Sequence, residues 1–333
     1  MYSLLHHNTF GIDAKCREFK EYTTVEELLS ILPKIRNEKW LQIGGGSNLL
    51  FVDDFEGTIL HSRILSCEEI KRTDSEVWLR VGAGVVWDEF VGQCVAKGYY
   101  GLENLSLIPG EVGASAVQNI GAYGVEAGQR IDSVETVEVA TGKLQVFSHE
   151  ECEYAYRSSV FKHALRGQYI VTHVVYRLSL NFSPDLDYGA IRRELESRQI
   201  SAEEVTAGSL RQLIIDVRRS KLPEPAELGS AGSFFMNPVV SQDKFESLLK
   251  QYPQMPHFPM TNGVKIPAGW MIEQCGWKGK SLGAAGVYSK QALVLVNLGG
   301  ATGQDIVRLS DAVRQSVKEK FGIDIHPEAN FIE

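Results

Sequence analysis

The sequence predicts an α+β protein with more than one domain. Segments with the continuous or alternating apolar residues of strands occur between segments whose apolar residues recur at helical spacing. The chain has 333 residues, 44% hydrophobic and 23% charged, which is enough for two or three domains of ordinary size. Pro223 ends the predicted amphipathic helix that begins at Ser209 and marks a domain boundary.

Composition excludes several classes of protein. The net charge of -8 argues against general nucleic-acid binding, which needs a basic surface. No apolar run is long enough to span a bilayer, and the first residues lack the layout of a signal peptide, so we expect a soluble cytoplasmic protein that binds no membrane. The 5 cysteines are scattered and odd in number, so we expect reduced thiols, and no metal site is predicted.

The first region predicts a small α/β unit. TTVEELLSILPKI, residues 23–35, has helical periodicity, and strands are expected at 39–43 and 57–61. The glycine run GGGSNLL, residues 44–50, lies between these strands, where its backbone N–H groups can cradle phosphate oxygens or form a plain turn. The dinucleotide fingerprint fails because Leu49 replaces its third glycine, and a P-loop fails because Gln274 replaces the first glycine before Gly279-Lys280-Ser281.

The second region predicts an α+β domain. A strand over 76–84 and a helix over 85–98 precede residues 109–124, PGEVGASAVQNIGAYG, which we expect to be a long loop. Its small residues allow the backbone to come close to a flat group, such as a planar ligand. Strands follow at 133–140 and 169–180, and VTHVVYRL alternates like one face of a sheet.

The third region, from about residue 222, contains AGSFFMNP, a helix over 243–252 and a strand over 292–298. A long helix is predicted over 302–322, where Thr302 and Asp305 form a capping pair and apolar residues recur at helical spacing. The last residues, GIDIHPEANFIE, predict a short terminal strand.

Ser233 lies in the middle of AGSFFMNP without the neighbours of a hydrolytic serine. A nucleophile elbow requires G-x-S-x-G, whereas two phenylalanines follow this serine. On local pattern alone, a turn residue is the more common explanation.

Several motifs together resemble the UDP-N-acetylenolpyruvoylglucosamine reductase family: GGGSNLL, IPGEVGASAVQNIGAYG, YAYRSSVFK, KLPEP, AGSFFMNP and HPEANFIE. They occur in the order of that family, and the segment at Tyr188-Gly189 resembles its form with an extra tyrosine loop. The resemblance implies an α+β fold of three domains. Two would form an FAD-binding fold of the vanillyl-alcohol-oxidase/PCMH type and the third would bind substrate, with expected boundaries at 1–66, 67–220 and 221–321 and a terminal strand, 322–333, that returns to the first domain.

The resemblance also implies the cofactors and the reaction. Non-covalent FAD would accept a hydride from NADPH and pass it to C3 of UDP-N-acetylglucosamine enolpyruvate, which yields UDP-N-acetylmuramate for peptidoglycan. A monomer is expected. The residues implied to surround FAD are Gly44, Gly46, Ser47, Asn48, Gly113, Ser115, Gln118, Asn119, Gly121 and Arg218.

Three residues match the catalytic positions of the family. Arg157 would bind the substrate carboxylate through its planar fork. Glu328 would assist the enolate, most easily if burial raises its pKa and keeps it protonated. Ser233 would protonate C2, a role that needs no activating base and so explains its neighbours.

Further positions match residues that contact the substrate: Tyr188, Lys221, Asn237, Lys278 and Gln291. The sequence departs from the family at three others. Phe258 lacks the hydroxyl of a tyrosine that reaches the substrate phosphates, Met236 replaces a basic residue, and Asn330 replaces an arginine.

Two other functions are compatible with this fold. A flavin oxidase that uses O2 and an alcohol often tethers its flavin through His, Cys or Tyr, and the motif loops offer no obvious His or Cys. A non-catalytic sugar-nucleotide sensor needs no proton donor, so the joint presence of Arg157, Ser233 and Glu328 argues against it.

Overall fold

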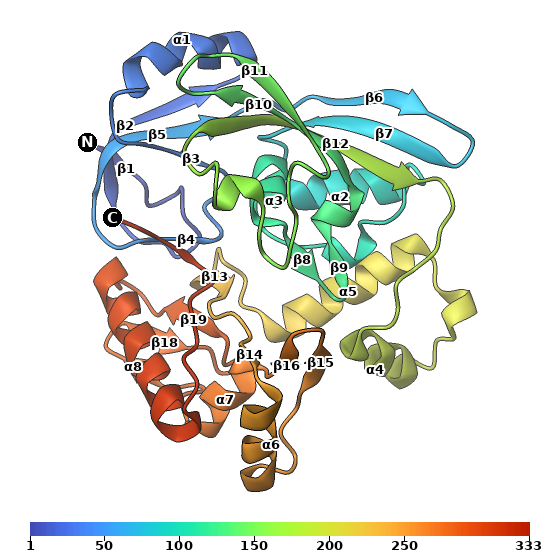
Figure 1. Ribbon diagram of the computed structural model, residues 1–333, viewed down its shortest axis with the longest axis vertical. Helices are drawn as coiled ribbons and strands as arrows, with labels where there is room; N and C mark the ends of the chain where they lie inside the picture. The colour runs from blue at the N-terminus through green and yellow to red at the C-terminus, as the bar shows by residue number, and fades with distance from the viewer. The chain divides into compact units, whose positions relative to one another are not determined.

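The computed structural model describes all 333 residues, which form two compact units (Figure 1). Unit 1 contains Met1–Lys15, Gly46–Phe55 and Arg219–Glu333, and unit 2 contains Cys16–Gly45 and Glu56–Arg218. Both units mix helices with strands, which confirms the predicted α+β class. No helix is both long and apolar enough to cross a membrane.

Unit 2 contains two main sheets. One includes the order β2-β5-β3, in which β3 and β5 are parallel, and the other has the antiparallel order β11-β10-β12-β7-β6. β8 and β9 form a small hairpin. The strands are β2 (Lys15–Tyr22), β3 (Trp40–Ile43), β5 (Phe55–Ser62), β6 (Cys67–Arg72), β7 (Glu76–Gly82), β8 (Gly121–Ala122), β9 (Val125–Glu126), β10 (Ile131–Glu138), β11 (Leu144–Ser148) and β12 (Tyr169–Ser179).

Helices cover these sheets and create separate apolar cores. The helices are α1 (Val25–Ile35), α2 (Trp87–Ala96), α3 (Val112–Gln118), α4 (Gly189–Arg198) and α5 (Ala207–Lys221). In Figure 1, α2 and α3 lie on the same side of β12 and β7, and the buried Trp87 and Phe90 of α2 share a core with Val174 and Tyr176 of β12. α1 covers a second core, and α4 and α5 pack together around a third.

β12 is buried more completely than the alternation of VTHVVYRL indicates. All residues from Ile170 to Tyr176 are buried. Ile170 joins the core under α1, whereas its neighbour Val171, which points to the opposite face, joins the core under α2 and α3. The strand is therefore covered on both faces, which alternation in the sequence did not indicate.

The glycine-rich segment 109–124 is not one loop, as predicted, because Val112–Gln118 forms α3. Val112 and Ala116 are one helical turn apart and both are fully buried in the core with β12. The helix ends at Asn119, whose left-handed backbone has φ +45°. Packing of a small-residue face on the sheet stabilises a helix too short to be stable by propensity alone.

Unit 1 contains several small sheets and three α-helices. Its sheets have the orders β13-β19-β18-β17 and β14-β16-β15, and β20 pairs with β4 in parallel. The elements are β1 (Tyr2–Ser3), β4 (Leu49–Phe51), β13 (Gly229–Ser233), β14 (Val239–Val240), α6 (Gln242–Gln251), β15 (Phe258–Met260), β16 (Gly263–Lys265), α7 (Ala268–Gln274), β17 (Ser281–Leu282), β18 (Ala285–Val287), β19 (Val294–Asn297), α8 (Gly303–Phe321) and β20 (Asn330–Ile332).

The long terminal helix is confirmed as α8. The Thr302 side chain accepts a hydrogen bond from the Asp305 N–H, and the Asp305 carboxylate accepts one from the Thr302 N–H at 2.9 Å. Its buried face contains the residues predicted from periodicity: Ile306, Leu309, Val313, Val317 and Phe321. Figure 1 shows α8 beside β18 and β19, the strands that it covers.

The terminal strand β20 pairs with β4, so that Asn330 lies opposite Leu49. This pairing groups residues 46–55 with the C-terminal part of the chain. The compact units therefore divide the predicted first domain, 1–66, between them. The expected three-domain boundaries stay a prediction.

Candidate active site

In unit 2, the first glycine motif lies against the second. Gly44 and Gly45 directly follow β3. A side-chain carbon at Gly44 would lie 3.1 Å from Oε2 of Glu111, and one at Gly45 would lie 3.4 Å from the Cα of Gly110. The two motifs, far apart in sequence, therefore lie in close contact, with the Glu111 side chain against Gly44.

In unit 1, the same glycine run continues with Gly46, Ser47 and Asn48. Gly46 has φ +63°, and a Cβ there would lie 2.1 Å from the carbonyl oxygen of His7, so only glycine fits. Asn48 Nδ2 donates to the carbonyl of Glu328 at 3.3 Å, and the N–H of Asn330 donates to the carbonyl of Asn48 at 3.0 Å. Asn48 is therefore tied to the HPEAN motif.

Two residues predicted to bind FAD are engaged in bonds within unit 2. Ser115 Oγ donates to the Val112 carbonyl at 2.7 Å and shares a 2.6 Å hydrogen bond with the Tyr176 hydroxyl. Asn119 Nδ2 donates to Glu126 and to the Ala155 carbonyl, and its Oδ1 accepts from the Gly128 N–H. Both side chains are about 1% exposed, so they stabilise the conformation of the second glycine motif from the protein interior.

Arg157 lies beside other predicted FAD residues of unit 2. Its Nη2 donates to the Gly121 carbonyl at 2.6 Å, and its own backbone has φ +54°. Lys162 Nζ donates both to Gln118 Oε1 at 3.1 Å and to the Arg157 carbonyl at 3.2 Å. Arg157, Gln118 and Gly121 therefore form one group, held together by a lysine that the sequence analysis did not identify.

A second group in unit 2 contains Arg218 and Tyr188. Arg218 Nε donates to the carbonyl of Leu107 at 3.2 Å, and burial lowers the pKa of this guanidinium. The rings of Tyr123 and Tyr188 meet edge to face, with centroids 5.5 Å apart. Burial raises the pKa of Tyr123, while the nearby Arg218 opposes that shift.

Strained backbone concentrates around these loops. Left-handed φ values are uncommon for residues other than glycine and gather at functional sites. In unit 2 such values occur at four residues of the groups above: Leu107, Asn119, Tyr123 and Arg157.

In unit 1, Ser233 and Glu328 lie on adjacent segments. Ser233 is exposed at the end of β13, and the residue after it, Phe234, accepts a hydrogen bond from the Glu328 N–H at 2.7 Å. An isolated bridge joins Phe235 to Pro327, so the two segments run antiparallel. The predicted proton donor and the predicted carboxyl group therefore come from motifs that are neighbours in space. Arg157 belongs to unit 2.

Three of the predicted substrate residues of unit 1 fall at two places around α7. Asn237 Oδ1 accepts from the Ala268 N–H at 2.9 Å, and Gln291 Oε1 would lie 3.2 Å from a Cβ on Gly269. Both side chains thus meet the beginning of α7. Lys278 lies beyond its end, where Nζ forms a 3.0 Å ion pair with Glu273. Lys221 is exposed at the end of α5.

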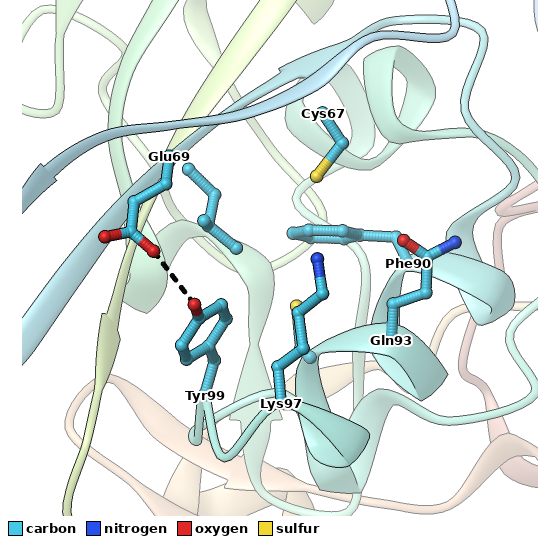
Figure 2. A pocket seen from close by; sticks show the side chains of 8 residues that line it. Cys67, Glu69, Phe90, Gln93, Lys97 and Tyr99 are labelled. Atoms are coloured by element: carbon cyan, nitrogen blue, oxygen red, sulfur yellow. Dashed lines mark hydrogen bonds between the residues drawn. The ribbon is translucent and has the colours of Figure 1, made fainter.

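The small cavity in Figure 2 contains none of the predicted site residues. It has a volume of about 50 Å³ and lies between α2 and the strands β6 and β7 of unit 2. Cys67 and Phe90 point toward it with Lys97, and the Tyr99 hydroxyl donates to Glu69 at 2.9 Å. Burial raises the pKa of both thiols that line it, Cys67 and Cys94, so neither has the character of a reactive thiolate.

Comparisons with known proteins identify the family. A model described as UDP-N-acetylenolpyruvoylglucosamine reductase, C-terminal domain, matches residues 224–332, and one described as FAD binding domain matches residues 19–148. The reductase of that name from Bacteroides fragilis is 58% identical over 99% of both chains. The chain belongs to the UDP-N-acetylenolpyruvoylglucosamine reductase family. It is an oxidoreductase with an FAD-binding domain.

More distant members of the reductase family also match along the whole chain. The Porphyromonas gingivalis reductase is 47% identical over 99% of this chain and 98% of its own length. The crystal structure of the reductase from Thermus caldophilus has a TM-score of 0.68 and covers 99% of this chain, with 23% identity. That structure shows the fold, which agrees with the predicted flavoprotein architecture.

The glycine segments fit the diphosphate of FAD. Any side chain at Gly44 would press on the buried Glu111 carboxylate, which favours glycine at this position of the turn. Backbone N–H groups in a glycine-rich turn can bind phosphate oxygens without a G-x-G-x-x-G motif.

Four residues that support these predicted positions were not predicted from the sequence. Tyr123, Lys162 and Glu111 each lie against a predicted site residue, and His61 pairs with Glu111. Tyr123 and Glu111 lie inside the quoted motifs, which could have singled them out. His61 lies in an ordinary buried strand and carries no such signal.

Proposed function

We propose that the chain reduces UDP-N-acetylglucosamine enolpyruvate to UDP-N-acetylmuramate, with NADPH as the reductant and non-covalent FAD as the cofactor. The family membership, with 58% identity over the full length, supports the substrate and the reaction class. When bound, FAD would supply the chemistry of hydride transfer from NADPH to C3 of the enolpyruvyl group. The residues of the chain then have three tasks: to hold FAD, to stabilise the charge that develops on the substrate, and to supply a proton to C2.

Ser233 supplies that proton. Its hydroxyl is exposed at the end of β13, where a substrate carbon can approach it. A hydroxyl is acidic enough to protonate a carbanion-like carbon when held at hydrogen-bonding range. The observation that carries this assignment is the 2.7 Å bond from the Glu328 N–H to the carbonyl of Phe234, which fixes the carboxyl segment beside the serine segment.

Arg157 and Glu328 stabilise the negative charge that spreads over C2 and the substrate carboxylate. The Arg157 guanidinium is oriented by its 2.6 Å bond to the Gly121 carbonyl, and its planar fork suits a carboxylate. Preorganised donors of this kind cost no rearrangement during the reaction, and the loss of one typically slows the rate about a hundredfold or more.

FAD is held mainly by backbone. Gly44, Gly46 and Gly113 belong to the two glycine motifs, at positions where close neighbours leave little room for a side chain, while Ser115 and Asn119 keep the second motif in shape. Ser47, Asn48, Gln118, Gly121 and Arg218 complete the proposed set.

The substrate diphosphate is bound by cations and amides. Because Asn237 uses its oxygen to hold α7, its Nδ2 group is the part that can donate to a phosphate. Lys221, Lys278, Tyr188 and Gln291 are the other proposed contacts. Phe258 is 51% exposed and has no hydroxyl, so it offers the substrate an apolar ring only. The resemblance alone supports a monomer and a cytoplasmic location.

Anaerobic spectroscopy tests the proposal. The purified protein should be yellow, NADPH should bleach it, and UDP-N-acetylglucosamine enolpyruvate should restore the colour without oxygen. A simple alcohol that bleaches the protein, with colour restored only by O2, would instead indicate an oxidase. A protein that binds the sugar nucleotide without any change in the flavin spectrum would indicate a sensor.

A further inference from the structure

His61 of unit 2 lies between two carboxylates. Its Nε2 is 2.8 Å from Oε1 of Glu111, and its Nδ1 is 3.1 Å from Oε1 of Glu21. His61 and Glu111 are 7% and 8% exposed, whereas the Glu21 side chain is half exposed. The His61–Glu111 pair is therefore a buried contact between side chains that are 50 residues apart.

This pair lies directly behind the first glycine motif. His61 is in β5 and is the parallel partner of Ile43, the last residue of β3 before Gly44. Glu111 immediately precedes α3, and its second oxygen, Oε2, would be 3.1 Å from a side-chain carbon on Gly44. One carboxylate thus contacts both the base of the glycine turn and the histidine beside it.

With both carboxylates ionised, only a protonated imidazole satisfies this geometry. Neutral histidine has one N–H and could donate to only one of the carboxylates, whereas the charged ring donates to both. Burial alone would lower the pKa of His61, but the hydrogen bonds and charges of Glu111 and Glu21 outweigh burial and raise it. Two other side chains lie near this histidine and its partners. Arg63 Nε is 3.7 Å from the Glu21 carboxylate, and the ring centroids of Phe19 and His61 are 6.0 Å apart.

We propose that protonated His61 is a positioning residue for the flavin. Through Glu111 it locks the Gly44-Gly45 turn against the 110–114 segment, in the arrangement that presents backbone N–H groups to the diphosphate. His61 itself does not touch FAD. This inference rests on the proposed FAD site and adds that the site depends on one proton held behind it.

A dependence on pH follows from the charge of this ring. The pKa of His61 is raised in the folded protein. The stabilisation that the protonated ring provides is therefore complete below the ordinary histidine pKa of about 6.5, and it is lost as the pH rises through the higher pKa of the folded state. When the ring loses its proton, one carboxylate loses its donor and the buried Glu111 no longer faces a positive charge. FAD affinity should therefore decrease on the alkaline side of neutrality.

The test measures FAD binding to FAD-free protein by the quenching of flavin fluorescence, from about pH 6 to about pH 9. The unaltered protein should bind FAD progressively more weakly as the pH rises. His61→Gln should bind FAD about ten- to a hundredfold more weakly at neutral pH, the range expected for losing a hydrogen bond to a charged group, and its affinity should not change with pH in this way. His173→Gln is the matched control, because His173 is equally buried in unit 2 but faces Arg80, and its pKa is lowered.

A double-mutant cycle separates positioning from general damage. Glu111→Gln should reproduce the effect of His61→Gln, and the double variant should be no worse than either single one. Glu111→Gln also provides the test if His61→Gln does not fold. Wild-type affinity and pH profile in both single variants would overturn the inference, as would a flat pH profile in the unaltered protein. Failure of the unaltered protein to bind FAD would overturn the proposed function as well.

Discussion

Asn119 connects three segments of unit 2 through one buried side chain. It bonds to Glu126, to the Ala155 carbonyl and to the Gly128 N–H, while its backbone ends α3 with φ +45°. Asparagine tolerates this left-handed conformation better than most residues. A single position therefore fixes both the end of the helix and the approach of the loop that carries Arg157.

Replacing Asn119 should destabilise the protein strongly. Asn119→Ala leaves buried partners unsatisfied and adds left-handed strain, so we expect a loss of about 2–4 kcal/mol in the free energy of unfolding. Urea denaturation of the FAD-free protein measures this loss. Asn119→Gly relieves the backbone strain but does not restore the lost hydrogen bonds, so it should recover only a minor part of the lost stability. A glycine variant as stable as the unaltered protein would show that the bonds contribute little.

The helix α8 shows how an element is defined by its ends as well as by its apolar face. The side chains of Thr302 and Asp305 each accept a hydrogen bond from the other's backbone N–H. At the other end, Gly322 adopts φ +61° and its N–H donates to the Lys318 carbonyl at 2.8 Å. Both signals lie in the sequence itself, so this helix could be predicted almost to the residue.

Thr302→Ala should reduce the free energy of unfolding by about 1 kcal/mol, because it removes the acceptor for the Asp305 N–H. Thr302→Ser keeps that acceptor and should retain most of the stability. Chemical denaturation of the three proteins under identical conditions compares them. Equal losses in both variants would mean that the threonine methyl group, rather than the cap, stabilises the end of α8.

Other elements could not be predicted because their stability comes from contacts rather than from pattern. α3 consists largely of small residues and becomes a helix only against β12. β6 is exposed at every position, so it has no apolar alternation to recognise. The strands β14, β15 and β16 have two or three residues each, too few for any periodicity.

The candidate site was predicted in its chemistry but not in its geometry. Motif resemblance named Ser233 and Glu328, and the structure adds that their segments are bonded neighbours. The contact between Gly44 and Glu111 joins residues far apart in sequence, which no local spacing can reveal. His61 was missed for the same reason.

The molecule as a whole performs its proposed reaction in two halves that use different residues. In that proposed reaction, reduction of the flavin by NADPH would need no proton at C2, whereas transfer to the enolpyruvyl group would need one. A change at Ser233 should therefore separate the halves. This separation distinguishes a proton donor from a residue that only maintains the fold.

The most direct test mixes the protein with each reactant in turn under anaerobic conditions and follows the flavin absorbance. In Ser233→Ala, bleaching by NADPH should proceed at nearly the normal rate, while recolouring by UDP-N-acetylglucosamine enolpyruvate should slow by about a hundredfold to ten-thousandfold, the usual contribution of a general acid. Ser230→Ala, in the same strand β13, should leave both rates unchanged. Recolouring of Ser233→Ala at the normal rate, or equal slowing of both halves, would contradict the role of this serine.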